Sequence, residues 1–300
     1  MDGVLVVDKP AGLTSHDVVV IARRCLGEPH IGHTGTLDPL ATGVLPLACG
    51  QATRLIRFLT ASDKEYDAGI RFGLTTDSFD ITGHETSRCE AVPTSEAVER
   101  ALGSLRGEYL QTPPAYSAKK VAGERAYVLA RRREEVRLEQ VPVRVSRAEV
   151  LAFDGATARI GIVCSAGFYV RAFAHALGEL VGTGACLESL RRTRSGEFGV
   201  ADAIDIERLG SERDGWADRL IPLERLLPGF PAAALTDEGR RRVSHGQDVL
   251  AVHLSRREIS TRSEAVPPPW IRLLDAEGRL VALATAGSSA GSLHPTVVLI

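Results

Sequence analysis

Two alternating segments separated by a short turn constrain the fold of this chain most strongly. Residues 143–153 and 157–164 are rich in β-branched and apolar side chains at alternating positions, which is typical of half-buried strands. Asp154, Gly155 and Ala156 lie between them and form a hairpin signal. Because so short a turn joins antiparallel neighbours only, the chain is predicted to contain an antiparallel pair of strands.

Other segments predict further strands interleaved with helices. Residues 4–7 and 66–72 are expected to be strands, and residues 15–25 and 96–102 to be helices opened by Ser15 and Ser95 as N-terminal caps. Residues 168–181 are expected to run from a strand end into a helix. This mixture favours an α+β fold with a mixed, largely antiparallel sheet over a doubly wound fold.

A break in the pattern predicts two domains. Two prolines and a glycine occur within residues 227–231, and shorter segments such as 270–275 and 280–284 follow. We therefore expect a large domain at residues 1–228 and a small β-rich domain at residues 229–300. The polar stretch 255–269 ends in three prolines and is interpreted as a mobile surface loop.

Composition limits the class of protein. The 300-residue chain is 44% hydrophobic, which is ample for a buried core, yet it contains no apolar run near the roughly 20 residues that a membrane span needs. No basic segment with a cleavage site opens the sequence. The five cysteines lack a Cys-x-x-Cys pair and are interpreted as reduced thiols. We expect a cytoplasmic protein, and a monomer because no segment marks an oligomer surface.

One carboxylate stands in a loop of small residues at positions 32–43. Asp38 precedes Pro39, and glycines and threonines surround it, so a planar ligand can approach the backbone and hydroxyls can orient the carboxylate. Asp followed by Pro is also an ordinary helix start. A phosphate-binding loop is excluded because no Gly-Lys-Ser/Thr follows. His30 and His33 lack the Cys/His partners that a metal site needs.

Six ordered motifs resemble the bacterial TruB family of tRNA pseudouridine synthases. The Asp38 loop resembles the family's signature loop, and the other motifs extend over about two hundred residues. They are the opening strand and turn at 3–15, Lys-x-Tyr at 64–66, the Pro-Pro-x-Tyr-Ser-Ala block at 111–120, Gly-x-Tyr-x-Arg at 164–171, and residues 190–196.

The resemblance implies a set of site residues. Asp38 corresponds to the family's catalytic aspartate, Arg171 is expected to pair with it, and Tyr66 to stack on uracil or transfer a proton. The sequence leaves open whether Asp38 adds to the sugar, adds to the base or removes a sugar proton. No cofactor and no metal are implied. Further substrate or RNA-binding residues are expected to be His33, which would prop the space left by a flipped base, with Tyr169, Leu190, Lys9, Lys64, Lys119, Lys120 and Arg125.

The partner implied is the T stem-loop of tRNA, with the uridine at position 55 as the target. The net charge of −2 is distributed unevenly, with a surplus of +5 over residues 119–147, +4 over residues 239–257, and −6 over residues 62–99. A polyanion is expected to bind the basic stretches, and the small domain would be PUA-like and bind RNA. The basic stretch 131–137 is also compatible with a solvated helix face.

Two other functions compete with this interpretation. A guide-RNA-dependent synthase shares the aspartate loop, but residues 39–46 and the basic insert at 122–142 resemble the stand-alone bacterial kind. An RNA chaperone would use the same pocket and patches without needing Asp38, Tyr66 and Arg171. Ala166, Phe168 and the pair His175-Ala176 depart from the residues common in relatives, which puts RNA contacts in doubt rather than the reaction.

Overall fold

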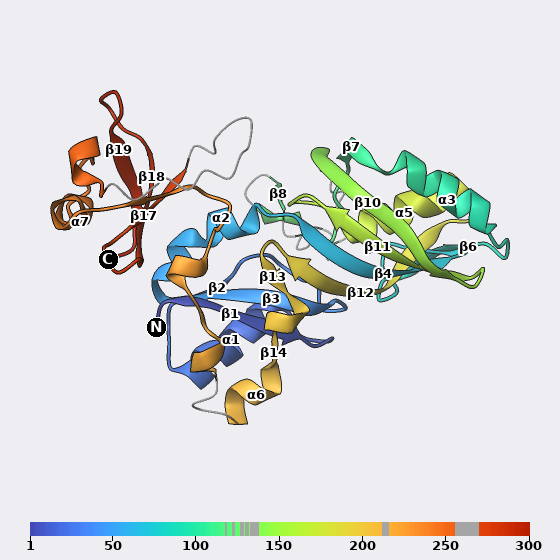
Figure 1. Ribbon diagram of the computed structural model, residues 1–300. Coiled ribbons are helices and arrows are strands. Elements are labelled where there is room, and N and C mark those ends of the chain that lie inside the picture. Colours follow the sequence, from blue (N-terminus) through green and yellow to red (C-terminus); the bar gives the residue numbers. More distant parts are fainter. Residues whose placement is uncertain are drawn as a thin grey trace.

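The computed structural model describes residues 1–117, 119–121, 124–126, 129, 132, 138–211, 216–255 and 270–300. A large mixed sheet and a smaller sheet organise these residues (Figure 1). The large sheet has the order β14-β1-β3-β12-β4-β11-β10-β7, with β13 on β12, β15 on β1 and β2 on β3. Only the pairs β1 with β14 and β3 with β12 are parallel among its described strands. The expected α+β fold is thus confirmed.

The bounds of the strands in the large sheet are as follows. They are β1 (Gly3–Lys9), β2 (Ile31–His33), β3 (Thr42–Cys49), β4 (Lys64–Phe72), β7 (Gly107–Gln111), β10 (Val141–Phe153), β11 (Thr157–Cys164), β12 (Ala185–Ser195), β13 (Phe198–Gly199), β14 (Ile204–Asp205) and β15 (Ile221–Pro222). Two short pairs stand apart, β5 (Leu74–Thr76) with β6 (Glu85–Arg88), and β8 (Lys120–Val121) with β9 (Glu124–Arg125).

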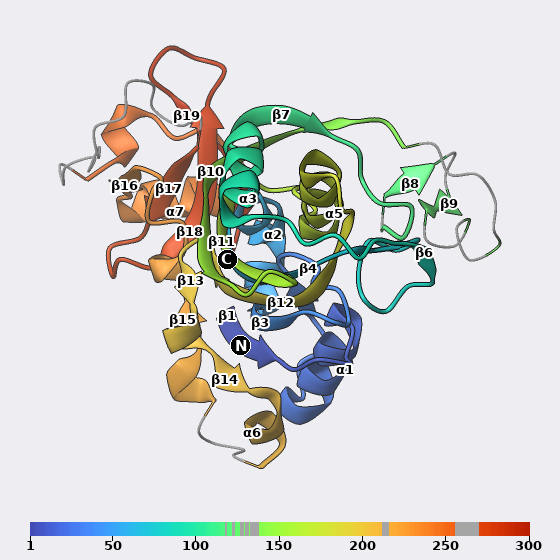
Figure 2. The same cartoon turned by 90° about the vertical axis from the view of Figure 1, so that its right-hand side faces the viewer.

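Helices cover the large sheet mainly on one face. They are α1 (Ser15–Leu26), α2 (Ile56–Thr60), α3 (Ser95–Ser104), α5 (Val170–Val181) and α6 (Ile206–Ser211). Figure 2 shows α3 beside α5 against the curved part of the sheet. The cap residues differ from those expected, because Thr14 and Thr94, each one position earlier, accept the first free backbone N–H groups of α1 and α3.

The run Val-Leu-Val-Val in β1 is buried on both faces of the sheet. Leu5 and Val7 join the core under α1, α3 and α5, whereas Val4 and Val6 pack on the opposite face. That second cluster also contains Leu55 and Leu59 around α2 and residues from the smaller sheet. The continuous apolar run therefore reflects a strand covered twice rather than a half-exposed one.

The smaller sheet lies entirely after residue 228 and is ordered β16-β17-β18-β19. Its strands are β16 (Ala232–Ala234), β17 (Ile271–Leu274), β18 (Leu280–Ala286) and β19 (Leu293–Val298), and α7 (Asp237–Ser244) packs beside them. Leu280, Leu283 and Leu299 contribute to the cluster that contains Val4 and Leu55. The two sheets are therefore joined by shared apolar packing. The predicted loop 255–269 falls almost wholly outside the described residues.

No helix in the described ranges is long and apolar enough to cross a membrane. The five cysteines are all free, as expected.

Candidate active site

Asp38 lies in the loop that joins β2 to β3. Strand β2 pairs with the end of β3, so the intervening residues 34–41 form a closed excursion from the sheet. The backbone N–H of Ala41 donates to the carbonyl of Asp38 (3.0 Å), and the chain then enters β3 directly. The alternative in which Asp38 caps a helix is therefore wrong, because no helix follows it.

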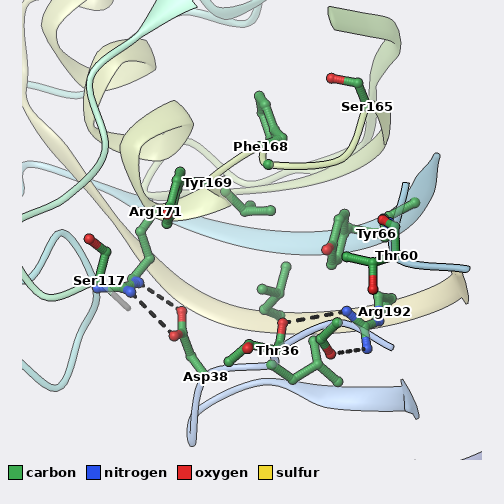
Figure 3. Close-up of a pocket in the computed structure, with 16 residues that line it drawn as sticks. Thr36, Asp38, Thr60, Tyr66, Ser117, Ser165, Phe168, Tyr169, Arg171 and Arg192 are labelled. Carbon is green, nitrogen blue, oxygen red and sulfur yellow. Dashed lines mark hydrogen bonds and ion pairs between the residues drawn. The ribbon is translucent and has the colours of Figure 1, made fainter. Parts of the chain in front are cut away.

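Arg171 holds the carboxylate of Asp38 in two-point contact. Its Nε is 2.8 Å from Oδ2 and its Nη2 is 3.2 Å from Oδ1 (Figure 3). Two further N–H groups donate to the carbonyls of Ser78 (3.1 Å) and Tyr116 (2.8 Å). A guanidinium with its donors fixed in this way sets the orientation of the carboxylate. The ion pair expected from the sequence is thus present.

The two partners of this ion pair differ in exposure. The Arg171 side chain is 6% exposed, whereas that of Asp38 is 38% exposed. Arg171 stands in the first turn of α5, which begins at Val170. The carboxylate is therefore anchored from the protein interior and open on its other side.

A second carboxylate, Asp80, approaches the same guanidinium, and the sequence interpretation missed it. Its Oδ2 lies 3.7 Å from Nε of Arg171, and the residue is buried. Oδ1 accepts from the hydroxyls of Ser78 (2.9 Å) and Thr82 (2.5 Å). The segment between β5 and β6 thus balances the buried charge of Arg171. The serine, threonine and glycine residues around Asp80 resemble those around Asp38 and were the available signal.

Arg192, on β12, fixes the Asp38 loop through hydrogen bonds, and it too was not singled out from the sequence. The side chain is 1% exposed and donates to the carbonyls of Val44 (2.7 Å), Gly35 (3.1 Å) and Thr36 (3.5 Å). Its backbone pairs with Gly43, whose φ is +101° and where a Cβ would lie 2.2 Å from the Arg192 carbonyl oxygen. Only glycine allows β3 and β12 to approach so closely at the end of the loop.

Lys9 contacts the same loop from β1. Its ammonium donates to the carbonyls of Pro10 (2.7 Å), Leu13 (2.7 Å) and Pro39 (3.4 Å), and the residue is fully buried. Burial lowers its pKa to about 8. This corrects the expectation that Lys9 contacts RNA. Its ammonium donates to the carbonyl of Pro39, the residue that follows Asp38, and no part of its side chain reaches solvent.

The threonine hydroxyls do not orient Asp38 as expected. Within the described residues, hydrogen bonds to its carboxylate come from Arg171. The hydroxyl of Thr42 donates a long hydrogen bond to the Leu190 carbonyl (3.4 Å). The hydroxyl of Thr34 is buried and has no hydrogen-bond partner among the described residues. Arginine, rather than the loop's own hydroxyls, therefore determines the carboxylate's position.

A pocket of about 240 Å³ opens beside Asp38. Figure 3 shows Asp38 and Arg171 at one side and Tyr66 with Arg192 at the other. Besides polar groups, large apolar or aromatic side chains line the pocket. These are Tyr66, Phe168, Tyr169, Val170 and Leu190. The structure thus brings five other predicted residues to the same cavity as Asp38, namely Lys64, Tyr66, Tyr169, Arg171 and Leu190.

Tyr66 and Lys64 lie on β4 at the far wall. Burial raises the pKa of Tyr66, and the neighbouring Arg192 guanidinium offsets part of that shift. The phenol is therefore protonated at neutral pH. Lys64 also lines the pocket, donates to the carbonyls of Thr60 and Ser62, and has a pKa lowered to about 8 by burial.

The remaining predicted residues lie outside the pocket wall. His33 is half-buried at the end of β2, its Nδ1 has no partner in the described structure, and burial lowers its pKa. Lys119 is half-buried and donates to the Glu139 carbonyl (3.1 Å). The side chains of Lys120 and Arg125 lie outside the described residues, as do most of residues 127–137. No cluster of metal-binding side chains occurs in the described ranges.

The fold resembles chains in solved structures of multi-component complexes. One is described as "Structure of H/ACA RNP bound to a substrate RNA containing 2'-deoxyuridine", with a TM-score of 0.75 and 24% identity over 99% of this chain and 85% of that chain. Another, "Crystal Structure of a Cbf5-Nop10-Gar1 Complex", gives a TM-score of 0.74 at 25% identity over 99% and 85% of the two chains.

Fold and pocket together define an enzyme of the pseudouridylate synthase class, since two family models of that class match consecutive parts of the chain. The model for the TruB family pseudouridylate synthase N-terminal domain matches residues 23–170, and that for the tRNA pseudouridylate synthase B C-terminal domain matches residues 171–228. The relative from Solibacter usitatus, named tRNA pseudouridine synthase B, is 43% identical over 100% of both chains. A relative of the same name from Mycolicibacterium paratuberculosis is 47% identical over 81% of this chain and 80% of its own. The chain belongs to the TruB family of pseudouridylate synthases, as its sequence motifs predicted.

Proposed function

We propose that this enzyme converts the uridine at position 55, in the T loop of tRNA, to pseudouridine without a guide RNA. The observation that carries the proposal is the Asp38 carboxylate, held by Arg171 in two-point contact at the edge of a pocket with aromatic and apolar walls. The relatives named tRNA pseudouridine synthase B extend over the whole chain, which supports tRNA as the substrate.

The reaction exchanges one bond of uracil for another. The bond from ribose C1′ to N1 breaks, the base turns, and a bond from C1′ to C5 forms, while C5 loses a hydrogen and N1 gains one. Atoms and electrons balance within the nucleotide, so the chemistry calls for no redox partner. Its requirements are a positioned carboxylate, a proton donor or acceptor, and a cavity that retains the detached base.

The pocket residues are suited to these tasks. Asp38 assists cleavage of the glycosidic bond, and Arg171 keeps its carboxylate oriented. Tyr66 offers a ring on which uracil stacks and a protonated hydroxyl, since its pKa is raised by burial. Tyr169 and Leu190 close the wall and exclude water from the base.

A stacked T-loop uridine has to leave the RNA before it can enter this pocket. We propose that His33, at the start of the Asp38 loop, props the vacated space with its flat ring. Lys119, Lys120 and Arg125 are proposed to contact phosphates, and residues 229–300 to form a PUA-like RNA-binding domain.

The proposal is tested by tritium release from unmodified tRNA labelled at uracil C5, with purified protein and no guide. Release that saturates at one site per tRNA, mapped to the T loop, is expected. Tight binding without release would overturn the proposal in favour of a chaperone. Release only after adding guide RNA would favour the guide-dependent class.

A further inference from the structure

Arg57 lies on α2, which Figure 1 shows between the smaller sheet and the large sheet. Its guanidinium carbon is 4.6 Å from the ring centroid of Phe58 and 5.2 Å from that of Trp270. These two rings meet edge to face, with centroids 4.8 Å apart, and Trp270 belongs to the smaller sheet's region. The exposed guanidinium of Arg57 therefore packs on two aromatic rings, one from α2 and one from the region of the smaller sheet.

The donors of Arg57 are unused within the described residues. Neither a hydrogen bond nor an ion pair joins its side chain to that part of the protein, whereas four exposed arginines around the large sheet pair with carboxylates. Those pairs are Arg71 with Glu188, Arg144 with Asp63, Arg147 with Glu65 and Arg159 with Asp67. Arg57 thus presents N–H groups to solvent where its counterparts are neutralised.

The position of Arg57 links it to the pocket. Thr60, three residues later on α2, lines the pocket beside Lys64. Residues three apart on a helix lie on the same side, about 5–6 Å apart at their Cβ atoms. The Arg57 Cβ therefore lies about one helical turn from a residue of the pocket wall, while its guanidinium lies over Trp270.

We propose that Arg57, held by Phe58 and Trp270, binds a backbone phosphate of the RNA whose uridine occupies the Asp38 pocket. Ring packing covers the face of the guanidinium and leaves its N–H edge free, and that edge matches the oxygens of a phosphate. Because the rings already restrict the side chain, less conformational freedom is lost when the phosphate binds. This inference rests on the proposed function, since it takes tRNA as the ligand.

The test compares Arg57→Gln with Arg57→Lys and with Arg100→Gln as a matched control. Arg100 is also exposed, but it lies on α3, at the opposite end of the molecule from the smaller sheet (Figure 1). For each protein, the dissociation constant of tRNA is measured at several salt concentrations, together with kcat, KM and the melting temperature.

Arg57→Gln is expected to raise KM and Kd about fivefold with kcat unchanged, and to reduce the slope of log K against log salt by about 1, as the loss of one phosphate contact does. Arg57→Lys should keep most of that slope, and Arg100→Gln all of it. A wild-type slope in Arg57→Gln, or an equal loss in Arg100→Gln, would overturn the inference. Salt-dependent binding is measured without turnover, so absence of tritium release in the wild type would contradict the proposed function separately.

Discussion

Arginines at the Asp38 pocket and arginines on α7 have opposite surroundings. Arg171 and Arg192 are at most 6% exposed, and Arg192 donates to backbone carbonyls of the loop that carries Asp38. The side chains of Arg240 and Arg241 on α7 are 48% and 66% exposed and pair with Asp275 and Glu238. The first group positions the Asp38 carboxylate and its loop, and the second is neutralised at the surface.

This difference shows why a count of charges along the chain does not locate a binding site. Residues 239–257 carry a surplus of four positive charges in the sequence. In the structure, however, Arg240 pairs with Asp275, which is 35 positions later in the chain, and Arg242 donates to the Asp248 carbonyl (2.8 Å). Near the pocket, Arg192 is buried against the Asp38 loop and donates hydrogen bonds to the backbone carbonyls of that loop. Burial and partners, which only the fold determines, distinguish a positioning arginine from a solvated one.

The largest effect that would sharpen this contrast is expected at Arg171. Arg171→Lys keeps the charge but loses the two-point contact with Asp38 and the donors to Ser78 and Tyr116. A reacting group displaced by about 1 Å costs on the order of 10²-fold in rate. We expect kcat to fall by about that factor with little change in tRNA affinity, and a variant with wild-type kcat would break the assignment of Arg171 as the positioning residue.

A smaller effect is expected when the loop loses its support. Arg192→Gln leaves carbonyls of Gly35, Thr36 and Val44 short of donors, each at a cost of roughly 1–3 kcal/mol. We expect the free energy of unfolding to fall by about 3 kcal/mol and kcat to fall about tenfold. Urea denaturation and single-turnover rates measure both.

The neighbouring Arg191 provides the control for Arg192. Its side chain is 40% exposed and pairs with Asp8 (2.6 Å). Arg191→Gln should change stability by less than about 1 kcal/mol, as is usual for exposed pairs. Equal destabilisation by the two variants would show that burial does not separate the two arginines.

Buried lysines near the pocket predict a pH dependence. Burial lowers the pKa of Lys64 to about 8, so between pH 8 and about 10.4 the unfolded chain binds more protons than the folded one. Stability contributed by this group therefore rises with pH across that window, and below pH 8 the full cost of burying the charge is present. Relative to Lys64→Met, the wild type should gain about 1 kcal/mol from pH 8 to pH 9.

The comparison with Lys64→Met is necessary because buried thiols act in the opposite sense. Burial raises the pKa of Cys49 and of Cys164 to about 12, which lowers the stability of both proteins as pH rises above 9. Urea denaturation at each pH gives the difference in unfolding free energy. A difference that does not change with pH would contradict the assignment.

The smallest effect is expected on α7. Arg241→Gln removes an exposed charge that Glu238 already neutralises (2.8 Å). We expect the melting temperature to be unchanged and tRNA affinity to stay within about twofold. A loss comparable to that of Arg57→Gln, measured as Kd at the same salt concentration, would place α7 in the RNA contact surface.

Much of the fold was predictable because its patterns are local. The hairpin of β10 and β11 and the helix α1 follow from alternation, turn residues and periodicity, and their observed bounds agree with the prediction within one or two residues. The cap residues were misplaced by one position because Thr14 and Ser15 are both good caps, and the bond from Asp17 to Thr14 decides between them.

The site was predictable only in part, for a physical reason. Family motifs led to Asp38, Tyr66 and Arg171, but the segment containing Asp80 reaches Arg171 only after the chain has folded. The burial of Lys9 likewise depends on loops that close over β1. Nothing in the local sequence distinguishes a buried lysine that binds carbonyls from an exposed one that binds phosphate.

The most direct test of the central claim is single-turnover tritium release from C5-labelled tRNA by the wild type and by Asp38→Asn, with tRNA affinity measured in parallel. We expect no release from Asp38→Asn and an affinity within about tenfold of the wild type, or ~1.4 kcal/mol, because the substitution is isosteric and the pocket walls remain. Comparable release from the two proteins would contradict the role of Asp38 as the reactive carboxylate.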